Sequence, residues 1–229
     1  VSKYKADGSF NRTKGRLVAC EAASRYYVPD TWSPTVGLSS VRLLLDIAAA
    51  HGAHILTLDV SGAYLKGKRT SRAKVFARLP PSLDLVSEVW NDPRIRYHDE
   101  NGNRNFFAVE TNWYGLQDAG VLWYRCLCDW LTSDEMGFVQ STADPCVFIR
   151  RRSNDFIYLC AYVDDTLTIF SSLELKTWFV EHFERKFDQS PDSGDSQAEF
   201  LGIAINTSEG RTRHALNTPR VFDRLEQRL

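Results

Sequence analysis

The stretch Phe156–Phe170, which reads FIYLCAYVDDTLTIF, decides the fold of this chain. Two apolar runs, Phe156–Tyr162 and Thr166–Phe170, flank a pair of adjacent acids, and runs of this length are typical of buried β-strands. We therefore expect a hairpin with Asp164 and Asp165 at its tip. Adjacent carboxylates between buried strands repel each other and lose hydration, and a divalent cation is the usual remedy.

A third carboxylate that could share a cation with this pair is Asp59. It follows the apolar run Ile55–Leu58, and a bend of small residues comes after it. Mg²⁺ prefers carboxylate and phosphate oxygens, and two such ions about 3.5–4 Å apart stabilise both the attacking and the leaving oxygen of an in-line phosphoryl transfer. Asp59, Asp164 and Asp165 are thus candidate catalytic and metal-binding residues, with Mg²⁺ or Mn²⁺ as the cofactor.

Periodicity elsewhere predicts helices and further strands around this hairpin. The predicted helices each have an apolar face and a suitable beginning or end: Leu38–His51 (N-cap Ser39 or Ser40, Gly52 beyond its end), Ala119–Glu135 (terminated by Gly137), a helix to about Phe187 opened by a capping box at Ser171–Glu174, and a last one from Thr218. The other predicted strands are a hairpin around Ala6–Gly8 whose second strand ends at Cys20, His54–Val60, Lys74–Leu79, a polar hairpin within Arg94–Glu110, and Pro145–Ile149. This order predicts an α+β fold in which helices cover one face of an antiparallel sheet.

Composition bounds the class of protein. The chain has 229 residues, of which 43% are hydrophobic and 25% charged, which suffices for a packed core. Its formal charge is −1, whereas a domain that binds nucleic acid is more often visibly basic. Basic clusters exist at 3–16, 66–74 and 150–152, but such runs are usually solvated surface. No apolar run reaches the ~20 residues that span a bilayer, so we expect no membrane segment.

The cysteines and the N-terminus bear on location. Five cysteines, an odd number without Cys-x-x-Cys spacing, favour a reducing compartment. The chain begins with neither Met nor an apolar leader, so we expect no secretory signal and a chain cut from something longer.

Six short motifs in order resemble the reverse transcriptase domain of copia-type (Pseudoviridae) LTR retrotransposon polyproteins. The motifs, which cover nearly the whole chain, are Lys3–Ser9 with Lys14–Ala19; Trp32–Val36 with Leu38–Arg42; Leu58–Gly67; Trp113–Leu116 leading to Trp123 and Tyr124; Tyr162–Asp165; and Phe200–Ile203. Each motif alone is a weak signal. Their order and spacing together make the resemblance specific.

The resemblance implies an RNA-directed and DNA-directed DNA polymerase with a right-hand fold of fingers and palm. It implies that 1–53 holds part of the fingers and the first palm helix, 54–67 the palm strand with the first catalytic Asp, 68–112 fingers, 113–205 palm, and 206–229 the start of the thumb or connection. The site residues that it implies are Asp59, Val60, Asp164 and Asp165 for metal, Lys14, Arg16, Tyr64, Gln117 and Asp118 for the nucleotide, and Phe200, Leu201 and Gly202 for the primer grip.

The partners implied are an RNA or DNA template with its primer, deoxynucleoside triphosphates and the remaining Pol polyprotein with its ribonuclease H and integrase. No membrane partner is implied. The implied location is intracellular, in a cytoplasmic virus-like particle and in the nucleus. Template preference and oligomeric state stay open.

The chain departs from the family pattern beside the nucleotide. Where the family has Gly-Leu-Lys-Gln-Ala-Pro-Arg, this chain has Gly-Leu-Gln-Asp-Ala-Gly-Val at 115–121, so the expected Gln is Asp118. A negative charge near a triphosphate weakens its binding. One alternative is therefore a non-catalytic relic that keeps nucleic-acid affinity. Another is a different metal-dependent phosphotransferase, although the chain has no Gly-rich phosphate loop. An isolated Asp-Asp pair in a turn, moreover, is usually structural or solvated.

Overall fold

The computed structural model describes residues 2–4, 9–13, 18–19, 30–68, 75–78, 101, 106–109, 111–188, 197–208 and 211–214. Its helices are α1 (Leu38–His51), α2 (Ala63–Lys66), α4 (Ala119–Leu131) and α5 (Leu173–Phe187). Its strands are β1 (Ser2–Tyr4), β2 (Phe10–Thr13), β3 (His54–Asp59), β4 (Val75–Ala77), β5 (Phe107–Val109), β6 (Val139–Gln140), β7 (Val147–Arg152), β8 (Asp155–Tyr162), β9 (Asp165–Phe170), β10 (Gln197–Phe200), β11 (Ile203–Ser208) and β12 (Arg211–His214).

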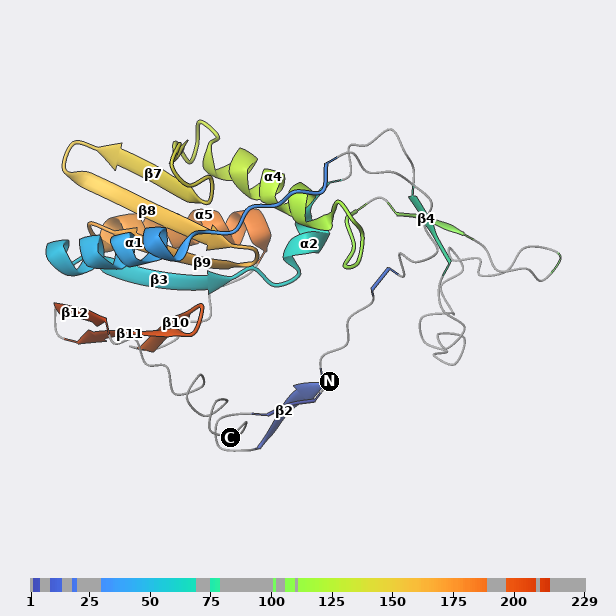
Figure 1. Ribbon diagram of the computed structural model, residues 1–229, viewed down its shortest axis with the longest axis horizontal. Coiled ribbons are helices and arrows are strands. Elements are labelled where there is room, and N and C mark those ends of the chain that lie inside the picture. Colours follow the sequence, from blue (N-terminus) through green and yellow to red (C-terminus); the bar gives the residue numbers. More distant parts are fainter. Residues whose placement is uncertain are drawn as a thin grey trace.

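A five-stranded antiparallel sheet in the order β3-β9-β8-β7-β6 forms the centre of the fold (Figure 1). Helices α4 and α5 cover one face of this sheet, while α1 and the three-stranded sheet β10-β11-β12 cover the other. The prediction of an α+β fold with an antiparallel sheet and covering helices is confirmed. The prediction that helices cover only one face is wrong. Both faces of the central strands carry apolar side chains, so each face is covered by a layer of secondary structure.

Strand β8 shows this alternation most clearly. Ile157 and Leu159 point into the core under α4 and α5, whereas Phe156 and Cys160 point into the core under α1. We call these the α4–α5 core and the α1 core. The buried residues of the α4–α5 core include Leu58, Val60, Trp123, Leu127, Trp130, Phe148, Phe170, Phe179, Phe183 and Phe187. Those of the α1 core include Val41, Leu44, Leu45, Ala48, Val147, Leu167, Ile169, Phe200, Ile203 and Ile205.

Helix α1 spans the residues that were predicted, and Gly52 ends it in the left-handed conformation with φ 59°. Its predicted N-cap is wrong. Neither Ser39 nor Ser40 caps it, because Gly37 is the N-cap and has no side chain to do so. The carboxylate of Asp144 takes that role from a distant loop, accepting from the Gly37 N–H at 3.0 Å and from the Ser40 hydroxyl at 2.6 Å. Burial opposes ionisation of Asp144, yet these hydrogen bonds prevail and its pKa is lowered.

Helix α4 ends earlier than predicted, at Leu131 instead of Glu135, and Gly137 is not its terminator. Thr132 is the C-cap, and both its N–H and its hydroxyl donate to the carbonyl of Cys128 at 2.8 Å. Hydroxyl groups that bond helix carbonyls locally compete with continuation of the helix. Gly137, with φ 64°, instead turns the chain toward β6.

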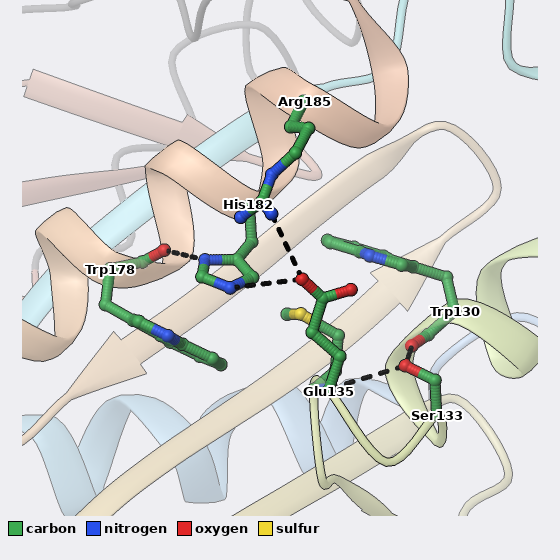
Figure 2. A network of polar contacts seen from close by, with 7 residues as sticks. Trp130, Ser133, Glu135, Trp178, His182 and Arg185 are labelled. Carbon is green, nitrogen blue, oxygen red and sulfur yellow. Dashed lines mark hydrogen bonds and ion pairs between the residues drawn. The ribbon is translucent and has the colours of Figure 1, made fainter.

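The turn after α4 is tied to α5 by a polar network (Figure 2). Glu135 lies 3.5 Å from Nε2 of His182 and 3.3 Å from the guanidinium of Arg185. Nδ1 of His182 lies 2.7 Å from the carbonyl of Trp178, whose ring packs on the imidazole at a tilt of 39°. Helix α5 itself begins at Ser172, whose hydroxyl accepts from the Leu175 N–H, and ends at Phe187 as predicted.

The remaining predicted elements lie at the edges. The N-terminal hairpin is confirmed as the antiparallel pair β1–β2, but β2 ends at Thr13, and 14–17 lie outside the described residues. The strand predicted at Lys74–Leu79 is β4, which pairs with β5. Most of the predicted hairpin at 94–110 and the helix from Thr218 lie outside the described residues. None of the described helices is long and apolar enough to span a bilayer.

Candidate active site at the tip of the central hairpin

The hairpin β8–β9 carries the acidic pair as predicted. Tyr162 pairs with Asp165, so Val163 and Asp164 form a two-residue loop. Val163 has φ 56° whereas Asp164 has no positive φ, and a positive φ at the first loop position alone fits the type II′ turn, in which glycine normally occupies this place. A β-branched residue there is strained by about 1–3 kcal/mol. The loop therefore requires surrounding contacts that hold it in this shape.

Two hydrogen bonds clamp this loop from different elements. The indole N–H of Trp123 in α4 donates to the carbonyl of Val163 at 2.6 Å, and the N–H of Val60 donates to the carbonyl of Asp164 at 2.9 Å. Trp123 is 1% exposed and lies in the α4–α5 core, so its indole cannot swing away without opening that core. The strained turn is thus held by Val60, which directly follows β3, and by Trp123 of α4.

Asp59 reaches the same end of the sheet through strand β3. β3 pairs with β9 so that Asp59 lies directly opposite Asp165. Ile55 and Leu167, which have the same parity on these strands, contact the α1 core, so alternation puts both carboxylates on the face away from α4 and α5. The sequence predicted the three acids on neighbouring strand ends, and the pairing register now brings two of them opposite each other.

Electrostatics links the three carboxylates. Burial raises the pKa of Asp165, and the negative charges of Asp164 and Asp59 raise it further. Repulsion of this kind requires that the groups sense each other at short range. The charges of both neighbouring carboxylates thus act on Asp165, in keeping with the strand register that places the acids at one end of the sheet.

The side chains of the predicted metal-binding residues differ in how exposed they are. Within the described ranges, no group of three or more His, Cys, Asp or Glu side chains is arranged so that it could hold a metal ion. Asp59 is exposed, and Asp164 and Asp165 are half-buried. Val60 is fully buried in the α4–α5 core, so only its backbone could contact an ion.

Tyr64 lies in α2, just after the bend at Gly62, which has φ 68°. Its half-buried ring lies 5.2 Å from the ring of Tyr114, tilted by 59°. The segment that carries Tyr114 is in turn anchored by the Ala19 N–H, which donates to the Tyr114 carbonyl at 2.7 Å. Motif order put both tyrosines near the nucleotide, but their mutual contact was not foreseen.

Gln117 and Asp118 precede α4. Gln117 is exposed, whereas Asp118 is 6% exposed and is the N-cap residue of α4. A carboxylate at a helix N-terminus is stabilised by the helix dipole. The negative charge that departs from the family pattern therefore has a structural reason to be there. Lys14 and Arg16, predicted to contact the triphosphate, lie outside the described residues.

The predicted primer grip lies in the tight turn between β10 and β11. Phe200 is 2% exposed and packs in the α1 core, while Leu201 and Gly202 form the turn with φ 52° and 78°. β10 contacts β3 and β9, so this small sheet lies against the face that carries Asp59 and Asp165.

Trp123 and the Val60 N–H are contributors to the site whose role no sequence signal revealed. Trp123 is 40 residues from Val163, and a tryptophan on the apolar face of a helix has the pattern of an ordinary core residue.

Sequence comparisons relate this chain to known proteins. A sequence family described as "Reverse transcriptase (RNA-dependent DNA polymerase)" matches residues 1–218. The "Retrovirus-related Pol polyprotein from transposon RE1" of Arabidopsis thaliana is 30% identical over 205 residues, which are 89% of this chain and 13% of that protein. The corresponding polyprotein from transposon TNT 1-94 of Nicotiana tabacum is 27% identical over 233 residues, covering 100% of this chain and 16% of that protein.

A further relative is the Ty1-ER2 Gag-Pol polyprotein of Saccharomyces cerevisiae, which is 24% identical over 193 residues and covers 80% of this chain and 10% of that protein. The chain therefore spans a small part of each of these polyproteins. Among solved structures, one match is telomerase from Candida albicans in complex with a fragment of telomeric RNA. The match covers 79% of this chain and 35% of the telomerase chain, with 8% sequence identity. Its TM-score of 0.36 is too low to carry an argument.

Proposed function

This chain belongs to the reverse transcriptase (RNA-dependent DNA polymerase) family, its relatives are copia-type retrotransposon Pol polyproteins, and from this premise we propose that it is the fingers and palm of an active RNA- and DNA-directed DNA polymerase. The observation that carries the proposal is the register of Asp59 against Asp165, with Asp164 in the adjoining turn. Three carboxylates at one end of a palm-like sheet are the donor set for two-metal nucleotidyl transfer.

The residues that would hold Mg²⁺ or Mn²⁺ are Asp59, Asp164, Asp165 and the backbone of Val60. Carboxylate oxygens suit these hard ions, and the raised pKa of Asp165 marks negative charge that a cation would relieve. When bound, such ions neutralise phosphate charge and stabilise the attacking and leaving oxygens. Asp59 is exposed, so its carboxylate is accessible to an ion from solvent.

The nucleotide would lie beside the Tyr64–Tyr114 pair. Tyr64 would contact C2′ of the incoming sugar, leaving room for hydrogen but not for a hydroxyl group. The tilted packing of Tyr114 on Tyr64 would restrict the position of that ring. Gln117, exposed just before α4, and the cations of Lys14 and Arg16 would contact the triphosphate.

The template and primer would lie at the end of the sheet where Asp59 and Asp165 are, beyond the layer of α1 and β10–β12, with Phe200, Leu201 and Gly202 supporting the primer strand. In this proposal 68–112 belongs to the fingers and 113–205 to the palm, and the thumb or connection begins at 206–229. The protein would act inside the cell within a virus-like particle, together with the ribonuclease H and integrase of its polyprotein.

Primer extension on RNA and DNA templates tests this function. A polyprotein segment that contains this chain should add deoxynucleotides to a primer on both templates in Mg²⁺ or Mn²⁺, and EDTA should abolish the addition. The same segment with no addition under any of these conditions would favour the non-catalytic relic.

A further inference from the structure

A hollow of about 450 Å³ lies on the solvent side of α4, away from the three carboxylates. Its wall on α4 consists of Leu122, Arg125, Cys126 and Asp129, which recur at the spacing of one helix face. The opposite α4 face, with Trp123 and Leu127 among others, is buried against the sheet. Since Asp59 and Asp165 lie on the far face of that sheet, the hollow is separate from the polymerase site.

Four cations line this hollow, which we call the α4 groove. Lys66 comes from α2, Lys68 from the residues just after it, Arg125 from α4 and Lys186 from α5. Among the described residues, the one acid in its lining is Asp129. Four cations from four segments converge although the whole chain carries a formal charge of −1. This local excess of positive charge differs from an ordinary solvated surface, on which positive and negative side chains are mixed.

The partners of these cations decide which of them remain available. Nζ of Lys66 donates to the carbonyl of Phe187 at 2.7 Å, which fixes its ammonium at the rim without neutralising it. The Arg125 guanidinium is paired with Asp30. Lys68 and Lys186 have no ion-pair partner among the described residues and are exposed.

The pKa of the Cys126 thiol is influenced by charged groups of the groove. Burial raises its pKa, and Asp129 raises it too, while Lys186, Lys68 and Lys66 act in the opposite direction. Three ammonium groups therefore lie close enough to one half-buried atom to influence its charge. The apolar part of the lining beside that thiol is the half-buried side chain of Leu122, with the buried ring of Phe187 behind it.

In the sequence, Lys68 is followed by three further basic residues, Arg69, Arg72 and Lys74, which lie outside the described residues. A second hollow of about 350 Å³ shares Asp129 and Lys186 with the α4 groove and continues along α5 toward His182 and Arg185. Arg185 is paired with Glu135 there (Figure 2), so positive charge weakens in that direction. Of these two hollows, the α4 groove is thus the more positive.

We propose that the α4 groove binds phosphate groups carried by a nucleotide or by a single strand of nucleic acid, as a second site distinct from the polymerase site. Lysine ammonium groups bind phosphates as point charges, and an apolar floor accepts the face of a base or sugar. A volume of about 450 Å³ lies within the range of small-molecule sites. Recognition by phosphate and an apolar ring favours a nucleic acid over an acidic peptide, whose carboxylates carry no such ring.

Protection of Cys126 from alkylation tests where the ligand binds. Cys128 is the internal control, because it is also half-buried with a pKa raised by burial, but it lies on another side of α4, near Gln140. N-ethylmaleimide modification of both thiols is followed by mass spectrometry in the Asp59→Asn protein, so that the polymerase reaction plays no part. Probes are a thymidine oligonucleotide of about twelve nucleotides, dTTP, inorganic tripolyphosphate and polyglutamate.

At a probe concentration about ten times its Kd, modification of Cys126 should slow about tenfold while that of Cys128 stays unchanged. Protection by the oligonucleotide alone identifies a strand as the ligand, and protection by dTTP as well identifies a nucleotide. Equal slowing of both thiols, no protection by either nucleotide probe, or stronger protection by polyglutamate or tripolyphosphate would overturn the proposal.

The salt dependence of oligonucleotide binding provides a second, variant-based test. Each phosphate contact on a single strand contributes about 0.7 to the slope of log K against log salt, so the double variant Lys68→Gln/Lys186→Gln should lower the slope by about 1.4. Lys176→Gln, a lysine on α5 outside the groove, is the matched control and should leave the slope unchanged. An unchanged slope in the double variant, with its circular dichroism intact, would overturn the proposal.

Discussion

The strained turn at Val163 predicts an inverted order of stability for two small substitutions. Val163 has φ 56°, and an L-residue pays about 1–2 kcal/mol in this left-handed region, whereas glycine does not. Val163→Ala and Val163→Gly both remove the side chain that packs against the α4–α5 core. The difference between the two variants therefore isolates the backbone conformation from the packing.

The magnitude follows from two opposing effects. Relief of the left-handed strain favours glycine by about 1–2 kcal/mol, while the greater freedom of glycine in the unfolded chain disfavours it by about 0.5–1 kcal/mol. Val163→Gly should therefore be more stable than Val163→Ala by roughly 0.5–1 kcal/mol. For a chain of 229 residues this corresponds to about 1–4 °C in Tm.

Urea denaturation of the two variants measures the difference, with Val147 in strand β7 as the matched control position. At Val147 the backbone is that of an ordinary strand, so Val147→Gly should be less stable than Val147→Ala by about 0.5–1 kcal/mol. If Val163→Gly proves no more stable than Val163→Ala, the left-handed turn and the strain attributed to it are refuted.

Three further variants probe the site. Because the pKa of Asp165 is raised in the fold, its charge destabilises the native state above that pKa. Asp165→Asn should therefore increase the free energy of unfolding near pH 7 by up to about 1 kcal/mol, and this gain should disappear as the pH falls below about 3.9. Thermal melts near pH 7 and below about pH 3.9 measure the difference. Trp123→Phe leaves the Val163 carbonyl without its indole donor. In urea denaturation it should lower the free energy of unfolding by about 1–3 kcal/mol more than Trp130→Phe, the matched core control, does. Equal losses in the two variants would argue against a stabilising role of the Trp123 hydrogen bond. Tyr64→Ala should narrow the ratio of kcat/KM for deoxy- and ribonucleotides, whereas a mere packing defect would lower both values alike.

Local sequence patterns were enough to predict most of the central fold. Apolar runs bounded by turn residues predicted the strands on either side of Asp164, and the 3.6-residue period predicted α1 to its last residue. Both signals arise from burial of one face, which the sequence expresses directly. The acidic tip could be found for the same reason, because carboxylates interrupt otherwise buried strands.

Contacts between distant residues could not be predicted in this way. Asp144 caps α1 from 107 residues away along the chain, and a local reading therefore assigned the cap to the nearest serines. The end of α4 depends on whether the hydroxyls of Thr132 and Ser133 donate to solvent or to the helix carbonyls of Cys128 and Trp130, as they do here. The positive φ of Val163 runs against local preference and is maintained by Trp123 and Val60.

The burial of Asp118 also needed the structure. In the sequence, an acid in place of the family's Gln indicated a weakened nucleotide site. In the fold this acid is buried at the start of α4, where the helix dipole favours a negative charge. The departure is thus compatible with a working site, and decay of the element is not needed to explain it.

Single-turnover nucleotide addition by Asp59→Asn and Asp164→Asn tests the central claim most directly. Each amide keeps the shape of the side chain and removes a charge that the metal ions require, so addition should fall at least about a hundredfold while the fold stays intact. Asp46→Asn, at an exposed acid on α1, is the matched control and should retain full activity. Addition that persists at more than a few per cent of the parent rate in either active-site variant would contradict the assignment of these carboxylates.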